Sequence, residues 1–333
     1  MILIALVVAL TGPSRALAGE KPLLRISTEN TTAHVHTRVM LRFVEELKHR
    51  AGERLDIRLY HSAELFRDRD VISAIDQGKV EMAVPGTWQI ERFVPDVAVF
   101  TLPMVYGRTR AEIDRLRDGD IGRIVDRRIE RSLAIHVVGR WIDLGFLNIF
   151  SVRKPIRRHE DLAGLKVRIA GGESNSMRLE AFGAEAQVIP WPDLGAALDA
   201  GTVDGVLSSH ATMASAELWT RGIRYAFEDR EHFAQYVPLI AGDFWDRLPP
   251  DLKTTITDTW ESIVELARGE AALAQTEARR LLIHHGVQVV TPGEATLSTW
   301  RKKLMTRQED VVTRVGVDPG LVARVTAVLE GGK

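Results

Sequence analysis

Strand and helix patterns alternate in two separate blocks of this 333-residue chain, and the alternation restricts the folds that it can adopt. In the first block, residues 24–27, 55–60 and 80–84 have the composition of strands, while 33–50 and 68–78 show the apolar spacing of helices. Strand–helix–strand order favours parallel strands covered by helices.

The second block repeats this order, with strands at 165–169, 186–189 and 203–207 and helices at 174–182 and 192–200. Two such blocks predict an α/β protein with two lobes rather than one large sheet.

A long helical stretch opens at Pro249-Pro250-Asp251. Apolar residues keep a helical period from Leu252 to Leu281, and Gly286 follows as a stop signal. A helix of this length would run about 50 Å, beyond the ~30 Å of a small domain. It must therefore bridge both lobes or break, and Gly269 is the candidate break.

The segment before the first helix offers two kinds of side chain. Thr31 or Thr32 can cap the helix through its hydroxyl group. His34 and His36 come closest in this chain to a metal-binding pair, but residues two apart on a helix do not share a face. We therefore expect no metal site there.

Composition argues against several classes of protein. The formal net charge is −1, whereas nucleic-acid-binding proteins usually show a basic excess. The chain contains no cysteine, which excludes disulfides and thiolate chemistry. It also lacks the G-x-S-x-G, G-x-x-x-x-G-K-[ST] and H-E-x-x-H motifs. An enzyme of a familiar type is disfavoured, and no cofactor, metal or nucleic-acid partner is expected.

The first eighteen residues have the pattern of a signal peptide. Met1 to Leu10 form an apolar run, and Ala16-Leu17-Ala18 precedes Gly19 as a cleavage site. The run is shorter than the ~20 apolar residues of a transmembrane helix. We expect removal of residues 1–18 and export to the periplasm, and no later segment is apolar enough to span a membrane.

Arg168 stands at the end of the strand expected at 165–169. Ligands of open α/β sheets bind beyond the carboxyl ends of strands, and a guanidinium offers a planar fork to a carboxylate. Asn30, Trp88 and Ser208 also follow predicted strands, so the four groups can converge on one site. The alternative for Arg168 is a surface position on an edge strand.

The segment around Arg168 carries a recognisable motif. Residues 153–168 follow the pattern R-x-P-I-x-x-x-x-D-L-x-G-L-K-x-R. Further matching segments are Phe182-Gly183-Ala184, Pro190-Trp191 and 197–205, with weaker matches at 60–65 and 99–103. From about residue 24 to 290, the chain resembles the dicarboxylate-type solute-binding proteins of tripartite ATP-independent periplasmic (TRAP) transporters.

This resemblance implies a two-lobed periplasmic-binding-protein fold, type II-like and of the TRAP solute-receptor form, which closes on its ligand and has a long helix crossing both lobes. It also implies that Arg168 forms a salt bridge to the ligand carboxylate and that Trp191 packs on the ligand. Asn30 matches a polar site residue of the first lobe, and Tyr236 lies near the return crossing between lobes.

The expected domain organisation follows from the same resemblance. Lobe I comprises 19–146 and is completed by part of 237–333, and lobe II comprises 147–236. The bridging helix covers 251–285, and 286–333 form a C-terminal packing segment.

Several positions depart from common members of the family, and one of them is Ser208, which replaces an amide of many members. Leu147 and Asn148 stand where many relatives supply a second arginine, and Gly86 leaves room where some place an acid. Because a buried carboxylate without a counter-ion is penalised, the missing second arginine predicts a ligand with one essential carboxylate.

The body of the ligand is predicted from the remaining candidates. Trp88 and Trp191 would form apolar walls, although core packing is the alternative for both. Ser208 and Asn148 would bond a hydroxyl or carbonyl group. His210 adds a donor or, when protonated, a charge that could hold a second carboxylate after all.

The sequence thus predicts a monomeric protein that captures a small organic acid in the periplasm and delivers it to TRAP permease subunits in the membrane. Two alternatives stay open at this stage. One is a sensing subunit that reports to a receptor, and the other is an exported enzyme on the same two-lobed fold.

Overall fold

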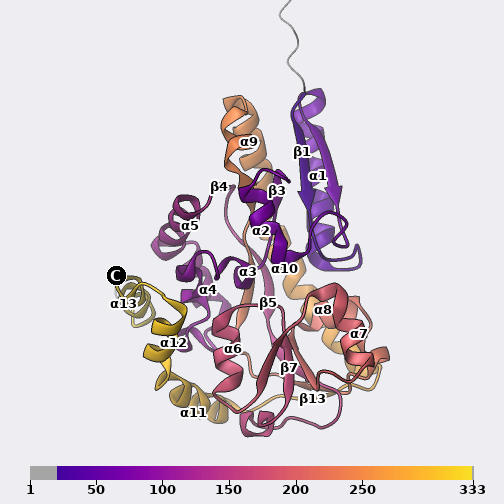
Figure 1. The fold of residues 1–333 in the computed structure, drawn as a ribbon, viewed down its shortest axis with the longest axis vertical. Coiled ribbons are helices and arrows are strands. Elements are labelled where there is room, and N and C mark those ends of the chain that lie inside the picture. Colours follow the sequence, from indigo (N-terminus) through magenta and orange to yellow (C-terminus); the bar gives the residue numbers. More distant parts are fainter. Residues whose placement is uncertain (1–20, 332–333) are drawn as a thin grey trace, which may run out of the picture.

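A computed structural model describes residues 21–331, so the expected signal peptide lies outside the described residues. The chain forms two main sheets that are joined by a pair of linking strands (Figure 1). The first sheet has five strands in the order β2 (Asp56–Tyr60), β1 (Leu23–Ser27), β3 (Met82–Ala83), β12 (Leu239–Ala241) and β4 (Ile135–Val137).

The second sheet has six strands. Their order is β13 (Gln288–Val290), β10 (Tyr225–Phe227), β6 (Asn148–Ser151), β9 (Gly205–Ser208), β7 (Lys166–Ile169) and β8 (Glu185–Val188).

Both sheets are mixed rather than wholly parallel. The strands of the two predicted blocks run parallel where they pair, as in β2–β1–β3 and β9–β7–β8. β12 pairs antiparallel with β3 and β4, and β6 pairs antiparallel with β9 and β10. β6 and β12 are the strands through which the chain enters the second sheet and returns to the first.

The linking strands are β5 (Ile142–Phe146) and β11 (Phe233–Tyr236), which pair antiparallel. The chain passes along β5 from the first sheet to the second and returns along β11 to β12. Their register shifts between Ala234 and Gln235. The two main sheets have separate hydrogen-bond ladders. The exact lobe boundaries stay a prediction.

Helices cover the sheets. Those between strands of the first sheet are α1 (Val35–Ala51), α2 (Asp68–Asp76), α3 (Thr87–Ile90), α4 (Arg110–Arg117) and α5 (Asp120–Ser132). The second sheet carries α6 (Glu173–Glu180), α7 (Leu194–Asp199) and α8 (His210–Ser215). After β12 come α9 (Gly242–Arg247) and α10 (Pro250–His284), and after β13 come α11 (Glu294–Met305), α12 (Gln308–Val315) and α13 (Pro319–Leu329).

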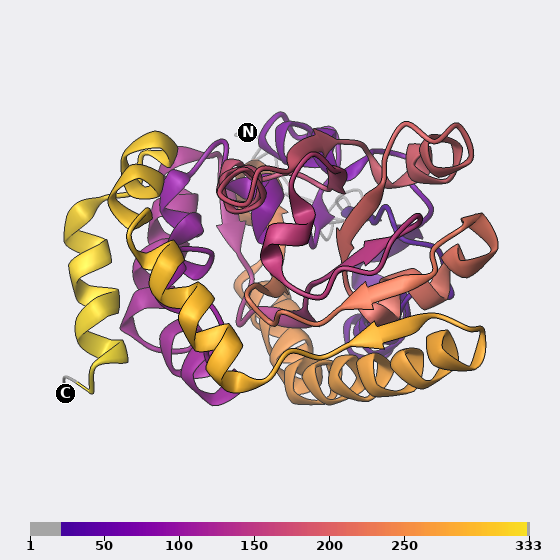
Figure 2. The same cartoon turned by 90° about the horizontal axis from the view of Figure 1, so that it is seen from below.

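The C-terminal segment contacts both halves of the molecule. β13 completes the edge of the second sheet, while α13 packs against α4 and α5 beside the first sheet (Figures 1 and 2). The first strand of the expected C-terminal packing segment therefore belongs to a sheet ladder.

The long helix α10 is continuous over 35 residues, so Gly269 does not break it. It packs against α1, α8 and β5 and runs along the lower edge of the molecule in Figure 2. Gln275 donates from Nε2 to the carbonyl of Leu144 at 2.6 Å and accepts from the amide of Ala211 at 3.0 Å. The helix therefore touches both halves. Glycine has a low helix propensity, and the tertiary contacts of α10 supply the stability that Gly269 does not contribute. Despite its length α10 is too polar to cross a membrane, and no other helix in residues 21–331 qualifies.

The start of α1 differs from the expected cap. The N-cap is His34 rather than Thr31 or Thr32, and its Nδ1 accepts a hydrogen bond from the amide of His36 at 3.1 Å. His34 and His36 are both buried, and burial lowers their pKa values to about 3 and about 4. The imidazoles are therefore neutral structural groups at neutral pH.

We predict that Gly269→Ala raises the free energy of unfolding by about 0.5–1 kcal/mol, because alanine loses less backbone entropy in a helix. An added Cβ at Gly269 meets no atom within 4 Å. The midpoint of urea denaturation measures the change. Gly205→Ala is the matched control, since its Cβ would lie 2.6 Å from the carbonyl oxygen of Phe150 and should destabilise. A lower midpoint for Gly269→Ala would contradict an uninterrupted helix.

Candidate functional site

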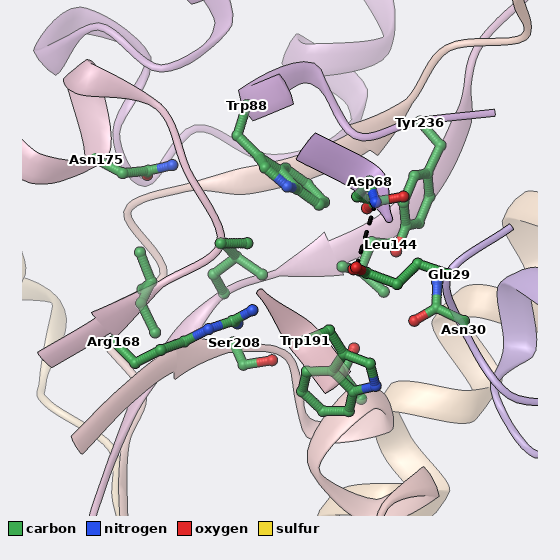
Figure 3. Close-up of a pocket in the computed structure, with 14 residues that line it drawn as sticks. Glu29, Asn30, Asp68, Trp88, Leu144, Arg168, Asn175, Trp191, Ser208 and Tyr236 are labelled. Atoms are coloured by element: carbon green, nitrogen blue, oxygen red, sulfur yellow. Dashed lines mark hydrogen bonds between the residues drawn. The ribbon is translucent and has the colours of Figure 1, made fainter. Parts of the chain in front are cut away.

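A small cavity lies where elements of both sheets and the linking strands meet (Figure 3). Its volume is about 50 Å³, far below the roughly 300–1,000 Å³ of pockets for drug-sized ligands. The walls therefore stand close together, and a ligand of more than a few atoms requires them to move apart. The lining residues are Glu29, Asn30, Asp68, Trp88, Leu144, Leu147, Arg168, Ala170, Asn175, Trp191, Leu207, Ser208, Thr212 and Tyr236.

Arg168 is buried at the end of β7, and its guanidinium points toward the cavity (Figure 3). Its Nε donates to the carbonyl of Ile189 at 2.8 Å, which holds the side chain in place. Burial lowers the pKa of Arg168 to about 10, although Glu29 and Asp68 favour the charged form. The guanidinium therefore remains a cation at neutral pH, and among the described residues it has no direct ion pair. It is not the surface residue of the alternative interpretation.

Aromatic side chains form part of the wall. Trp191 lies in a short 3₁₀ turn, with its ring 5.7 Å from the Arg168 guanidinium carbon. Trp88 packs edge-on against Tyr236 at 5.6 Å, and Tyr236 stacks on His36 at 4.1 Å. The indole Nε1 of Trp88 is buried and has no hydrogen-bond partner among the described residues. A ligand acceptor at this wall would satisfy it.

Two carboxyl groups that the sequence analysis missed line the same cavity. Glu29 Oε1 accepts a hydrogen bond from the amide of Asp68 at 3.2 Å, at the N-terminal end of α2 (Figure 3). Burial raises the pKa of Glu29, although the Asp68 amide and Arg168 oppose the rise. Burial and the neighbouring Glu29 raise the pKa of Asp68 well above its usual range. The two acids therefore bind protons more readily than free carboxyl groups and moderate the charge of Arg168.

The sequence contained a signal for one of these acids. Glu29 stands beside Asn30 directly after β1, so the strand-end argument that found Asn30 also applies to Glu29. Asp68 opens the expected helix, but only the packing of α2 brings it to the cavity.

Six of the eight candidate ligand residues line this cavity, namely Asn30, Trp88, Arg168, Trp191, Ser208 and Tyr236. Their contact with a ligand stays a prediction. The other two, Asn148 and His210, line a second cavity instead, where Asn148 Nδ2 lies 3.1 Å from His210 Nδ1. Leu147 faces the Arg168 cavity while the adjacent Asn148 faces the other, because the chain between β5 and β6 forms the partition.

Gly86 does not leave free space in the site. A Cβ atom at this position would lie 2.2 Å from the ring of Trp88, so the indole occupies the volume that the sequence analysis assigned to ligand. The expectation of extra room was wrong because the tryptophan two residues later folds back over the glycine.

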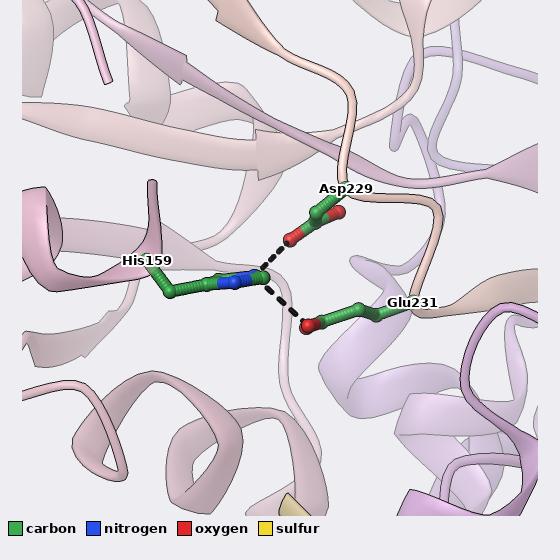
Figure 4. A group of neighbouring side chains, drawn as sticks. All are labelled: His159, Asp229 and Glu231. Atoms are coloured by element: carbon green, nitrogen blue, oxygen red, sulfur yellow. Dashed lines mark hydrogen bonds and ion pairs between the residues drawn. The ribbon is translucent and has the colours of Figure 1, made fainter. Parts of the chain in front are cut away.

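A buried group of His159, Asp229 and Glu231 has the composition of a metal site (Figure 4). His159 Nε2 lies 2.8 Å from Glu231 and 3.2 Å from Asp229. The Arg178 guanidinium lies 3.1 Å from Glu231, which supplies a second cation against the two acids. We interpret the group as an ion-pair network. Burial alone would lower the pKa of His159. The attraction of Glu231 and Asp229 for the imidazolium outweighs the effect of burial and raises the pKa of His159 to about 9.

Known sequences similar to this chain include solute-binding proteins of the kind that the sequence analysis expected. The model of the family described as "bacterial extracellular solute-binding protein, family 7" matches residues 26–312. The C4-dicarboxylate-binding periplasmic protein DctP of Rhodobacter capsulatus is 24% identical over 271 residues, which cover 79% of this chain and 78% of that protein.

Comparison with solved structures confirms the two-lobed fold. The sugar acid binding protein DctPAm of Advenella mimigardefordensis, solved with galactonate, matches with a TM-score of 0.87 and 20% identity over 94% of this chain and 99% of that chain. A TRAP periplasmic solute-binding protein of Sulfurospirillum deleyianum, solved with succinate, matches with a TM-score of 0.85 and 20% identity over 92% and 99%.

We predict that His159→Gln lowers stability most at pH 6.5 and below. A histidine whose pKa rises from 6.5 to about 9 on folding contributes stability that is complete below 6.5 and lost as pH rises through 9. The difference in unfolding free energy between wild type and variant should therefore shrink, by on the order of 3 kcal/mol, between these limits. Urea denaturation across pH measures it.

His49→Gln is the matched control, because His49 is exposed at the end of α1. Its effect should be small throughout. The contrary result is a loss of unfolding free energy in His159→Gln that stays constant or grows between pH 6.5 and 9. That result would show that the network does not stabilise the imidazolium.

Proposed function

The chain belongs to family 7 of the bacterial extracellular solute-binding proteins, and we propose that it captures a small organic acid in the periplasm and delivers it to a TRAP permease. The buried Arg168 guanidinium in the cavity between the lobes is the observation that carries this proposal. A carboxylate can accept two parallel hydrogen bonds from such a fork, which makes arginine selective for this group.

Ligand capture in this proposal is a closure of the lobes. Contacts between the two halves surround the cavity: Arg67 pairs with Asp193 at 2.6 Å, and Ser174 donates to Glu91 at 2.6 Å. The cavity is too small to admit an organic acid through fixed walls, so these contacts must open and re-form around the ligand. A ligand that contacts both halves favours the closed state because it binds that state more tightly.

The acids of the cavity support a monocarboxylate ligand. Glu29 and Asp68 lie beside the cation that receives the ligand carboxylate, so a second carboxylate on the ligand would meet like charge. Leu147 lines the wall where relatives supply a second arginine and gives such a group no counter-ion. Hydroxyl groups, in contrast, can donate to Glu29 and Asp68. We therefore propose a hydroxylated monocarboxylate rather than a C4-dicarboxylate.

The remaining parts of the proposal concern location and partners. The protein acts in the periplasm after removal of residues 1–18, works as a monomer, and carries out binding rather than catalysis. The membrane permease selects the ligand-bound closed form, and its ion gradient supplies the energy of transport. Sequence resemblance and the matched family support the periplasmic location and the permease partner.

We predict that Arg168→Ala weakens carboxylate binding by about 2–5 kcal/mol, because the ligand charge would be enclosed without its partner. Arg168→Lys should recover only part of the affinity, since an ammonium cannot copy the fork. Isothermal titration calorimetry measures both. Arg157→Ala, an exposed arginine of the same half, serves as the control and should bind like wild type. Binding of Arg168→Ala within about threefold of wild type would refute the role.

A competition panel tests the ligand class. We expect hydroxylated monocarboxylates such as galactonate to bind more tightly than succinate or malate, by at least about tenfold. Asp68→Asn should narrow this difference, because it removes an acid that repels the second carboxylate. Tighter binding of either dicarboxylate than of every monocarboxylate tested would overturn the ligand class and leave the transport role standing.

A further inference from the structure

A second cavity, of about 320 Å³, lies on the other side of the partition between β5 and β6. Its volume falls within the range of small-molecule pockets, roughly 300–1,000 Å³. It is bounded by the linking strands β5 and β11 and by the middle of α10. Nothing in the function proposed for the Arg168 cavity uses it.

The walls of this cavity are partly apolar. Phe146 and Phe233 contact each other edge to face at 5.1 Å, one from each linking strand. Ala271 and Ala272 of α10 lie opposite, and their small side chains leave the space open. Such walls favour an aromatic ring or a short aliphatic chain.

The polar groups that face the cavity are mainly hydrogen-bond donors. Asn148 Nδ2 can only donate, so His210 Nδ1 accepts and the neutral ring carries its proton on Nε2. This buried Nε2 lies 3.2 Å from Glu228 Oε1 but lacks an aligned hydrogen bond. Arg110 Nε is also buried without an aligned acceptor, 3.3 Å from Asp143 Oδ2. Two buried donors therefore lack good acceptors.

The charge balance points the same way. The acids of the cavity are Asp143 and Glu228, and each is already paired, Asp143 with Arg117 and Glu228 with Arg279. Arg230 lines the cavity, is exposed to solvent, and forms no ion pair or side-chain hydrogen bond among the described residues. This accessible cation beside two buried donors matches an anionic group.

We propose that this cavity is a second ligand site, for a small organic anion that carries a carboxylate on an apolar body. The carboxylate lies toward Arg230 and His210, and the body packs between Phe146 and Ala272. The inference does not depend on the function proposed for the Arg168 cavity, because none of these residues lines that cavity.

The test uses the full chain with Arg168→Ala, which disables the first site, and 4-fluorobenzoate as probe, followed by ¹⁹F NMR. We expect saturable binding below about 10 mM. Ala272→Trp should weaken it at least about tenfold by filling the cavity, and Arg230→Gln should weaken it about fivefold or more by removing the cation. The uncharged 4-fluorobenzyl alcohol should bind at least about tenfold more weakly than the carboxylate.

Leu273→Trp is the matched control, since Leu273 is the exposed neighbour of Ala272 on α10 and lies outside the cavity. It should leave probe binding unchanged, which separates cavity filling from damage to the helix. The proposal is overturned if the Arg168→Ala protein shows no saturable binding up to about 10 mM, or if Ala272→Trp binds the probe as tightly as Leu273→Trp.

Discussion

The continuous helix α10 constrains the rest of the structure, because one 35-residue element packs against parts of both halves. Backbone hydrogen bonds keep such a helix stiff, so the halves share a common support while their sheets keep separate ladders. The main chain crosses between the halves along β5 and β11, and both cavities adjoin these strands. Both cavities and the crossings between the halves therefore occupy the same region, and Gln275 ties the helix to it.

The chemistry of the first cavity follows from the cost of burying a guanidinium. Arg168 gives up water, and Glu29 and Asp68 offset part of that loss without forming a direct ion pair. In the proposed function, an incoming carboxylate competes with these two acids for the guanidinium. In the same proposal, the two acids disfavour a ligand with a second negative charge.

Buried charges elsewhere in the molecule serve a different purpose. The network of His159, Asp229, Glu231 and Arg178 connects the start of the second half to the segment before β11, and its charges are mutually paired. The Arg168 cavity and the second cavity differ from it in one respect. Their charged groups line a cavity, whereas His159, Asp229, Glu231 and Arg178 line neither of the two.

Local pattern was enough to predict the α/β alternation, the long helix and the place of Arg168 near a strand end, because periodicity and strand ends depend on neighbours in sequence. The motif around Arg168 also identified the family, which the matched model confirms. Tertiary structure alone decided which way Asn148 and His210 face, that Trp88 covers Gly86, and that Asp68 joins Glu29 beside Arg168. These outcomes depend on packing between elements distant in sequence, and a side chain's direction and electrostatic surroundings are properties of that packing rather than of any local pattern.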